Sequence, residues 1–216
     1  MKPALTDITI VLDRSGSMQT LKNDVIGGLN EFLNEQEKAP GEATVTLVQF
    51  DNEYESVYEA RPIGKAPRLT HTSYIPRGTT ALLDAIGRTI DSAGLRLAAI
   101  PEQNRPGKVL FVIQTDGLEN SSTIFSLQQV NEKITLQRDR YQWQFVFLGA
   151  NQDAIATAAS MNIPAHSTMS YAATPTGTQS VSRETARAVM AWRAGTTASV
   201  MMSDEERKKQ KAEGAQ

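Results

Sequence analysis

The chain has 216 residues, of which 40% are hydrophobic and 21% are charged, and its formal net charge is −2. This length suits one domain with a sizeable core, and the composition is typical of a globular protein. The nearly balanced charge provides no basic field, so we expect neither nucleic acid nor a membrane surface as a partner. Because the sequence has no cysteine, disulfides, thiolate metal ligands and cysteine nucleophiles are excluded.

Residues 1–202 are expected to form one domain, and residues 203–216 a charged tail. Beyond Ser203 the sequence is almost entirely charged and polar, which predicts either a disordered segment or a solvated helix. We find no apolar run long enough to span a bilayer and no apolar signal core near Met1. A cytoplasmic location is therefore the expectation, and the lack of disulfides fits a reducing compartment.

Apolar runs alternate with segments of helical periodicity along the chain. Residues 8–12 predict a strand and residues 18–37 a helix, and residues 43–50 then predict a second strand. After a turn at Asp51-Asn52, the polar residues 54–60 predict an antiparallel edge strand. The remaining expectations are a loop at 61–78, helices at 81–99, 124–138, 153–161 and 181–193, buried strands at 109–113 and 143–148, and a short strand within 163–170.

This order of elements predicts an α/β fold with a doubly wound, mostly parallel sheet of six strands. Helices should cover both faces, and one edge strand should be antiparallel. In open sheets of this kind, ligands bind beyond the carboxyl ends of the strands, near the point where the strand order reverses.

Three polar clusters follow predicted strands or precede predicted helices. They are Asp13-Arg14-Ser15-Gly16-Ser17, Gly78-Thr79-Thr80 and Thr115-Asp116-Gly117. Their spacing along the chain allows carboxylates and hydroxyls to meet at one edge of the sheet. A set of ligands made only of oxygen suits a hard cation such as Mg²⁺, whereas zinc sites usually use sulfur or nitrogen.

Asp13-x-Ser15-x-Ser17, Gly78-x-Thr80 and Thr115-Asp116-Gly117, in this order, resemble the metal-ion-dependent adhesion site of von Willebrand factor A domains. The resemblance extends over residues 6–195 in element order, and the compact arrangement looks like the single-domain versions found in bacteria and their phages. It implies a Rossmann-like fold and a bound Mg²⁺, with Mn²⁺ or Ca²⁺ as alternatives. The implied metal ligands are Ser15, Ser17 and Thr80, with Asp13 and Asp116 holding the ion directly or through water; Thr79 is the alternative to Thr80.

The favoured function is a non-enzymatic, metal-dependent protein-binding module. A partner's Asp or Glu would displace a metal-bound water and complete the coordination shell. The alternative is a Mg²⁺-dependent phosphatase or phosphotransferase with Asp13 as the nucleophile. Against this alternative, no histidine is placed to act as a base, and no lysine near Thr80 or Asp116 suggests a phosphate clamp.

Several residues near the clusters have a structural and a functional interpretation. Arg14 is expected to be a solvated surface arginine rather than a guide for acidic partners, and Ser17 is a candidate N-cap. Glu119 and Asn120 either line the rim of the site or belong to an ordinary polar loop. Asp153 is expected to cap a short helix rather than support the metal site.

Four further side chains are assigned to structure rather than chemistry. His71 and His166 are isolated, and Trp143 and Phe145 alternate with core positions, so we expect loop histidines and packing aromatics.

Overall fold

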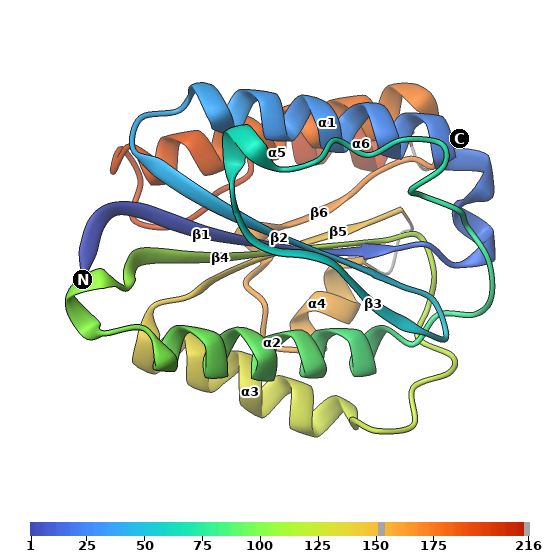
Figure 1. Cartoon of the computed structure of the whole chain (residues 1–216). Helices are drawn as coiled ribbons and strands as arrows, with labels where there is room; N and C mark the ends of the chain where they lie inside the picture. Colours follow the sequence, from blue (N-terminus) through green and yellow to red (C-terminus); the bar gives the residue numbers. More distant parts are fainter. Residues whose placement is uncertain (151–153, 214–216) are drawn as a thin grey trace.

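The computed structural model describes residues 1–150 and 154–213 and arranges them as three layers, with a sheet between two layers of helices (Figure 1). The strand order in the described part is β3-β2-β1-β4-β5-β6. The strands are β1 (Lys2–Asp13), β2 (Glu42–Phe50), β3 (Tyr54–Pro62), β4 (Pro106–Thr115), β5 (Gln144–Gly149) and β6 (Thr168–Ser170).

The pairing of the strands confirms the predicted topology. β1 pairs in parallel with β2 on one side and with β4 on the other, and β4-β5 and β5-β6 are also parallel. β3 pairs antiparallel with β2 and forms the expected edge strand. The strand order reverses between β1 and β4, so this is the place where a doubly wound sheet forms its ligand crevice.

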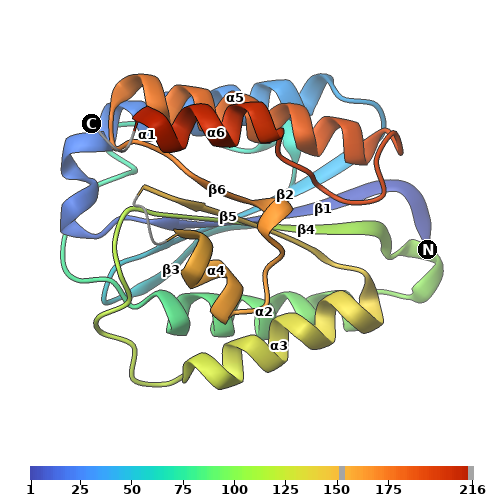
Figure 2. The ribbon, with the colours of Figure 1, turned by 180° about the vertical axis from the view of Figure 1, so that it is seen from behind.

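Helices cover both faces of the sheet, as predicted. Figure 2 shows α1, α5 and α6 on one face and α2, α3 and α4 on the other. Their bounds are α1 (Lys22–Lys38), α2 (Leu82–Ala99), α3 (Leu127–Tyr141), α4 (Ala154–Ser160), α5 (Pro175–Arg193) and α6 (Asp204–Glu213).

Alternation along the central strands divides the core into two clusters. Ile8 and Ile10 of β1 point toward α1 and α5, whereas Val11 belongs to the cluster beneath α2 and α3. In this second cluster Phe111 stacks on Trp143 with ring centroids 5.4 Å apart and lies 5.2 Å from Phe145. The assignment of Trp143 and Phe145 to packing is therefore confirmed.

Two helices begin later or earlier than the periodicity predicted. α3 starts at Leu127 instead of residue 124, because the Asp84 carboxylate accepts hydrogen bonds from the backbone amides of residues 123–125. These three residues are thereby held as a loop, and Ser126 caps the helix. α5 starts at Pro175 instead of residue 181, with Thr174 as its N-cap.

The first helix and the loop after β3 also differ from expectation. A 3₁₀ segment, Gly16–Leu21, precedes α1, so the helix proper begins at Lys22 rather than near residue 18. β3 continues to Pro62, and a short 3₁₀ turn (Ile63–Lys65) begins the segment that was expected to be loop throughout.

The charged C-terminal segment forms helix α6 beside α5. The backbone amide of Ser203 donates to Glu184 at 2.6 Å, and Ser180 bonds to Glu206. Met202, just before the helix, is buried, whereas Asp204 and Glu205 are exposed. The attachment of α6 near its first turn is therefore mainly polar.

Removal of residues 204–216 should lower the melting temperature by less than about 4 °C, which corresponds to roughly 1 kcal/mol for a chain of this size. The truncation removes hydrogen bonds at a partly exposed surface, and such bonds contribute little net stability. Thermal unfolding of the truncated and full chains, followed by circular dichroism, measures the difference. A decrease of more than about 8 °C would show that α6 is an integral part of the core.

Candidate metal site at the carboxyl ends of β1 and β4

The three polar clusters meet at the crevice between β1 and β4. Asp13 is the last residue of β1, and Thr115 is the last residue of the neighbouring strand β4. The segment Gly78-Thr79-Thr80 reaches the same place from the loop before α2, where the backbone amide of Gly16 donates to the carbonyl of Gly78 at 3.2 Å.

The Asp13 side chain is fully buried and fixed at both oxygens. Its Oδ1 accepts the backbone amide of Ser15 at 2.6 Å, and its Oδ2 accepts the Thr115 hydroxyl at 2.6 Å. The Tyr74 hydroxyl donates to the backbone carbonyl of Asp13 at 2.6 Å. The carboxylate therefore has one defined orientation at the base of the site.

Ser15, Ser17 and Asp116 form a continuous chain of oxygen atoms. The two serine hydroxyls are 3.1 Å apart, and the Ser17 hydroxyl donates to Asp116 Oδ1 at 2.7 Å. The prediction that Ser17 caps the first helix is wrong, because Ser17 lies inside the 3₁₀ segment Gly16–Leu21. Its hydroxyl faces Asp116 instead of the helix amides.

Thr80, rather than Thr79, joins this cluster. Thr80 is 3% exposed, whereas Thr79 is an exposed residue. The Thr80 hydroxyl lies close to Gly117 and to the Ser17 hydroxyl. A Cβ added at residue 117 would come 3.0 Å from Thr80 Oγ1 and 3.7 Å from Ser17 Oγ. Glycine at this position leaves the hydroxyl groups accessible to an ion between them.

The loop after Asp116 supports the site from behind. Asn120 Oδ1 accepts the backbone amide of Thr80 at 3.0 Å, and the amide of Asn120 donates to the carbonyl of Thr80 at 3.1 Å. Glu119 accepts the amide of Leu83 at the start of α2 and the amides of Ser121 and Ser122. Both residues thus position loops, and Asp153 lies outside the described residues.

Burial of the two carboxylates makes a cation favourable at this position. Burial, with a smaller contribution from the nearby Asp116 carboxylate, raises the pKa of Asp13 to about 6. The pKa of Asp116 is also raised, mainly by burial. A divalent cation would relieve the cost of two partly desolvated negative charges, and the surrounding hydroxyls supply further oxygen ligands. The residues present therefore fit a hard cation.

Arg14 is not the solvated surface arginine that the sequence suggested. It is only 7% exposed and donates to the buried carboxylate of Asp51 at 3.1 Å, and it also contacts Glu55. Asp51 follows β2 and Glu55 lies on β3, so their proximity to Arg14 depends on the folding of the sheet.

Three residues that organise this site were not predicted to do so: Thr115 was named only as a member of the third cluster, Asp51 only as a turn residue, and Tyr74 fell within the predicted loop. Thr115 immediately precedes Asp116 at a strand end, and Asp51 immediately follows a strand, so position alone gave a weak signal for both. Nothing in the local sequence around Tyr74 indicates that its hydroxyl reaches the carbonyl of Asp13.

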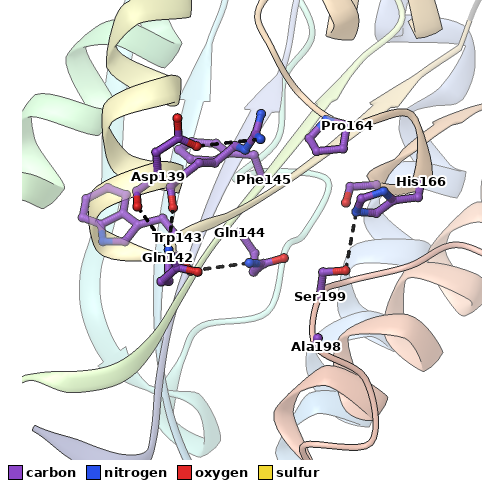
Figure 3. A pocket seen from close by; sticks show the side chains of 11 residues that line it. Asp139, Gln142, Trp143, Gln144, Phe145, Pro164, His166, Ala198 and Ser199 are labelled. Carbon is purple, nitrogen blue, oxygen red and sulfur yellow. Dashed lines mark hydrogen bonds and ion pairs between the residues drawn. The ribbon is translucent and has the colours of Figure 1, made fainter.

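A separate cavity of about 430 Å³ lies near the amino end of β5, away from the metal-site residues. Figure 3 shows it between the end of α3 and the segment that carries Ala198 and Ser199. His166 lines this cavity, and its Nε2 lies 3.5 Å from the Ser199 hydroxyl. Burial, followed by the charges of Arg138 and Arg207, lowers the pKa of His166, which favours its neutral form.

Within residues 1–150 and 154–213, no group of three or more His, Cys, Asp or Glu side chains is placed to hold a metal ion. A cation at the crevice would therefore depend on hydroxyl oxygens together with two carboxylates. None of the helices in these ranges combines the length and apolar composition needed to cross a bilayer.

Solved structures of other proteins share this fold. Proximal thread matrix protein 1 from the mussel byssus, with a zinc-occupied MIDAS motif, has a TM-score of 0.61 and 12% identity, over 84% of this chain and 47% of that one. The pilus adhesin SpaC from Lactobacillus rhamnosus GG, in its open conformation, has a TM-score of 0.62 and 15% identity, over 88% and 30%. A von Willebrand factor type A structure from Catenulispora acidiphila has a TM-score of 0.51 and 17% identity, over 88% and 43%.

The chain spans less than half the length of each of these structures. At such low identities the likeness establishes the fold. Neither a protein-family profile nor a curated protein matches the sequence.

Proposed function

We propose that this chain, which has the von Willebrand factor A fold, is a metal-dependent protein-binding module. Its site holds a divalent cation, with Mg²⁺ favoured over Mn²⁺ and Ca²⁺, and captures an Asp or Glu side chain of a partner protein. The observation that carries this proposal is the convergence of Asp13, Ser15, Ser17, Thr80 and Asp116 at the switch point of the sheet.

The charged and the neutral donor groups have different roles at the site. Asp13 and Asp116 supply two negative charges, which nearly neutralise a divalent cation. Ser15, Ser17 and Thr80 offer oxygen ligands without adding charge. A bound Mg²⁺ keeps some of its waters and supplies a positive centre that an incoming carboxylate can reach.

The descriptions of two of the solved structures support a binding role. The mussel protein is described as a thread matrix protein with zinc at its MIDAS motif, and SpaC as a pilus adhesin. Adhesion and matrix assembly both use binding without chemical turnover. We extend the metal-dependent part of that behaviour to this chain because its oxygen cluster lies at the switch point of the sheet, where open sheets of this kind bind ligands.

The geometry of Asp13 disfavours the phosphotransferase alternative. A nucleophilic carboxylate must present one oxygen to the phosphorus atom of its substrate. Asp13 is 0% exposed, and each of its oxygens already accepts a hydrogen bond within the protein. This carboxylate is therefore placed to orient the metal-site turn rather than to attack a substrate.

The choice between neighbouring threonines tests the ligand set. Thr80→Ala should weaken Mn²⁺ binding about tenfold, because it removes a hydroxyl that lies among the proposed ligands, while Thr79→Ala should leave the affinity unchanged. Isothermal titration of Mn²⁺ into the full-length variants measures both values. Equal weakening by the two substitutions, or by neither, would contradict the assignment of Thr80.

A phage-displayed library of random peptides tests the binding function directly. Selection on the protein with Mg²⁺ should enrich peptides that contain Asp or Glu, and elution with chelator should release them, because the carboxylate binds through the cation. Selection on Asp116→Ala provides the control. Peptides that bind equally well with chelator would argue against a metal-dependent module, as would Mg²⁺-dependent hydrolysis of a generic phosphoester that Asp13→Asn abolishes.

A further inference from the structure

Two arginines from different loops meet on one buried carboxylate beside the metal site. Asp51 follows β2 and is 0% exposed. Its Oδ2 accepts Arg14 Nε at 3.1 Å and Arg77 Nε at 2.9 Å. Arg14 belongs to the turn that carries Ser15 and Ser17, and Arg77 lies three residues before Thr80. The carboxylate of Asp51 thus connects both hydroxyl-bearing loops.

Backbone hydrogen bonds add to this connection. The carbonyl of Asp51 accepts the amide of Ala81 at 3.0 Å, next to Thr80, and the carbonyl of Arg14 accepts the amide of Arg77 at 2.8 Å. Asp51 Oδ1 accepts the amide of Glu53 at 2.5 Å, which fixes the turn from which Asp51 projects. The two loops and the turn therefore form one hydrogen-bonded unit.

The close approach at Gly78 shows how tightly this unit is packed. Gly78 has φ +67°, a conformation that favours glycine. A Cβ at this position would come 2.1 Å from Asn52 Oδ1 and 3.5 Å from the Asp51 Cβ. The loop before Thr80 thus lies directly against the turn that contains Asp51, without room for a side chain between them.

We propose that Asp51 is a positioning residue that sets the distance between the Ser15-Ser17 turn and Thr80 before a cation binds. This inference rests on the proposed metal site and assigns a new role within it. Asp51 is not itself among the proposed ligands. It acts through Arg14 and Arg77, whose loops it holds together, while Glu55 and Glu53 are the second carboxylate partners of these two arginines. Since the loops are ordered beforehand, cation binding does not have to supply the free energy of ordering them.

The test compares two buried Asp-Arg pairs in the full chain. Asp51→Asn removes the negative charge with which both arginines pair at the site. Asp7→Asn is the matched control, because Asp7 is 2% exposed and accepts Arg96 Nη1 and Nη2 at 2.9 Å each. Asp7 lies on the same strand as Asp13 but six residues earlier, roughly 20 Å away at the usual rise of a strand. Both substitutions should destabilise the fold, which thermal unfolding in chelator records.

Only Asp51→Asn should change the metal site. Its Kd for Mn²⁺, measured from the electron paramagnetic resonance signal of free Mn²⁺, should rise about 10- to 100-fold, as for other residues that orient metal ligands. Asp7→Asn should bind Mn²⁺ like the unmodified chain. If Asp51→Asn and Asp7→Asn bind Mn²⁺ as tightly as the unmodified chain, Asp51 has only a structural role and the inference is overturned.

A second variant keeps the test decisive if Asp51→Asn does not fold. Arg77 is 53% exposed at its side chain, so Arg77→Gln removes one connection at low cost to the fold. Its Kd for Mn²⁺ should rise in the same direction but by less, and an unchanged Kd would overturn the inference. Failure of the unmodified chain to bind Mn²⁺ is a different result, because it would overturn the proposed metal-dependent function and, with it, this role of Asp51.

Discussion

Saturating Mg²⁺ or Mn²⁺ should raise the melting temperature of the protein by about 5–10 °C. A ligand at 100 times its Kd that binds only the folded state adds about 2.7 kcal/mol to the free energy of unfolding. For a chain of this size each kcal/mol corresponds to roughly 2–4 °C. The unfolded chain cannot compete for the ion, because residues from three separate segments have to meet to form the site.

Differential scanning calorimetry in chelator and in metal measures this shift. Asp13→Ala should abolish it, because the substitution removes one of the two charges that balance the cation and also removes the acceptor for Ser15 and Thr115. Melting curves that coincide in chelator and in millimolar metal would exclude a functional site at this crevice.

Replacing Asp116 by Asn should weaken metal binding by at least roughly three orders of magnitude. At about 4 Å and an effective dielectric constant of about 20, a pair of unit charges interacts with roughly 4 kcal/mol, and a divalent cation interacts more strongly with the carboxylate than a single unit charge does. Each 1.4 kcal/mol corresponds to about a factor of ten in affinity. The amide of asparagine keeps an oxygen ligand and the size of the side chain, so the change isolates the charge. Because the partner's carboxylate binds through the cation, its capture should be lost as well.

Glu53→Gln is the control for this change in charge. Glu53 lies in the turn beside the site, its side chain is 64% exposed, and it forms an ion pair with Arg77. Solvent screens a carboxylate in this position, so the Kd for the metal should change less than about fivefold. Mn²⁺ titration of both variants measures the contrast. Similar losses of affinity in Asp116→Asn and Glu53→Gln would mean that the effect comes from the overall field and not from a metal ligand.

Local sequence was sufficient to predict the fold and the kinds of atoms at the site. The order of the elements could be predicted from strand alternation, helical periodicity and the polar pattern of the edge strand at residues 54–60. Each of these patterns depends on residues that are close together in the chain. Asp13, Ser15, Ser17 and Asp116 could be assigned to one cluster because the carboxyl ends of neighbouring parallel strands meet at the same edge of a sheet.

Tertiary structure alone decided which polar groups face each other. The sequence predicted an exposed Arg14, because its buried partner Asp51 lies 37 positions away and reaches it only when β1 and β2 pair. The start of α3 differs from the predicted start for the same reason, since Asp84, on α2, accepts hydrogen bonds from the amides of residues 123–125. Hydrogen bonds and ion pairs between distant segments leave no periodic pattern in a sequence, so these features became visible only in the folded chain.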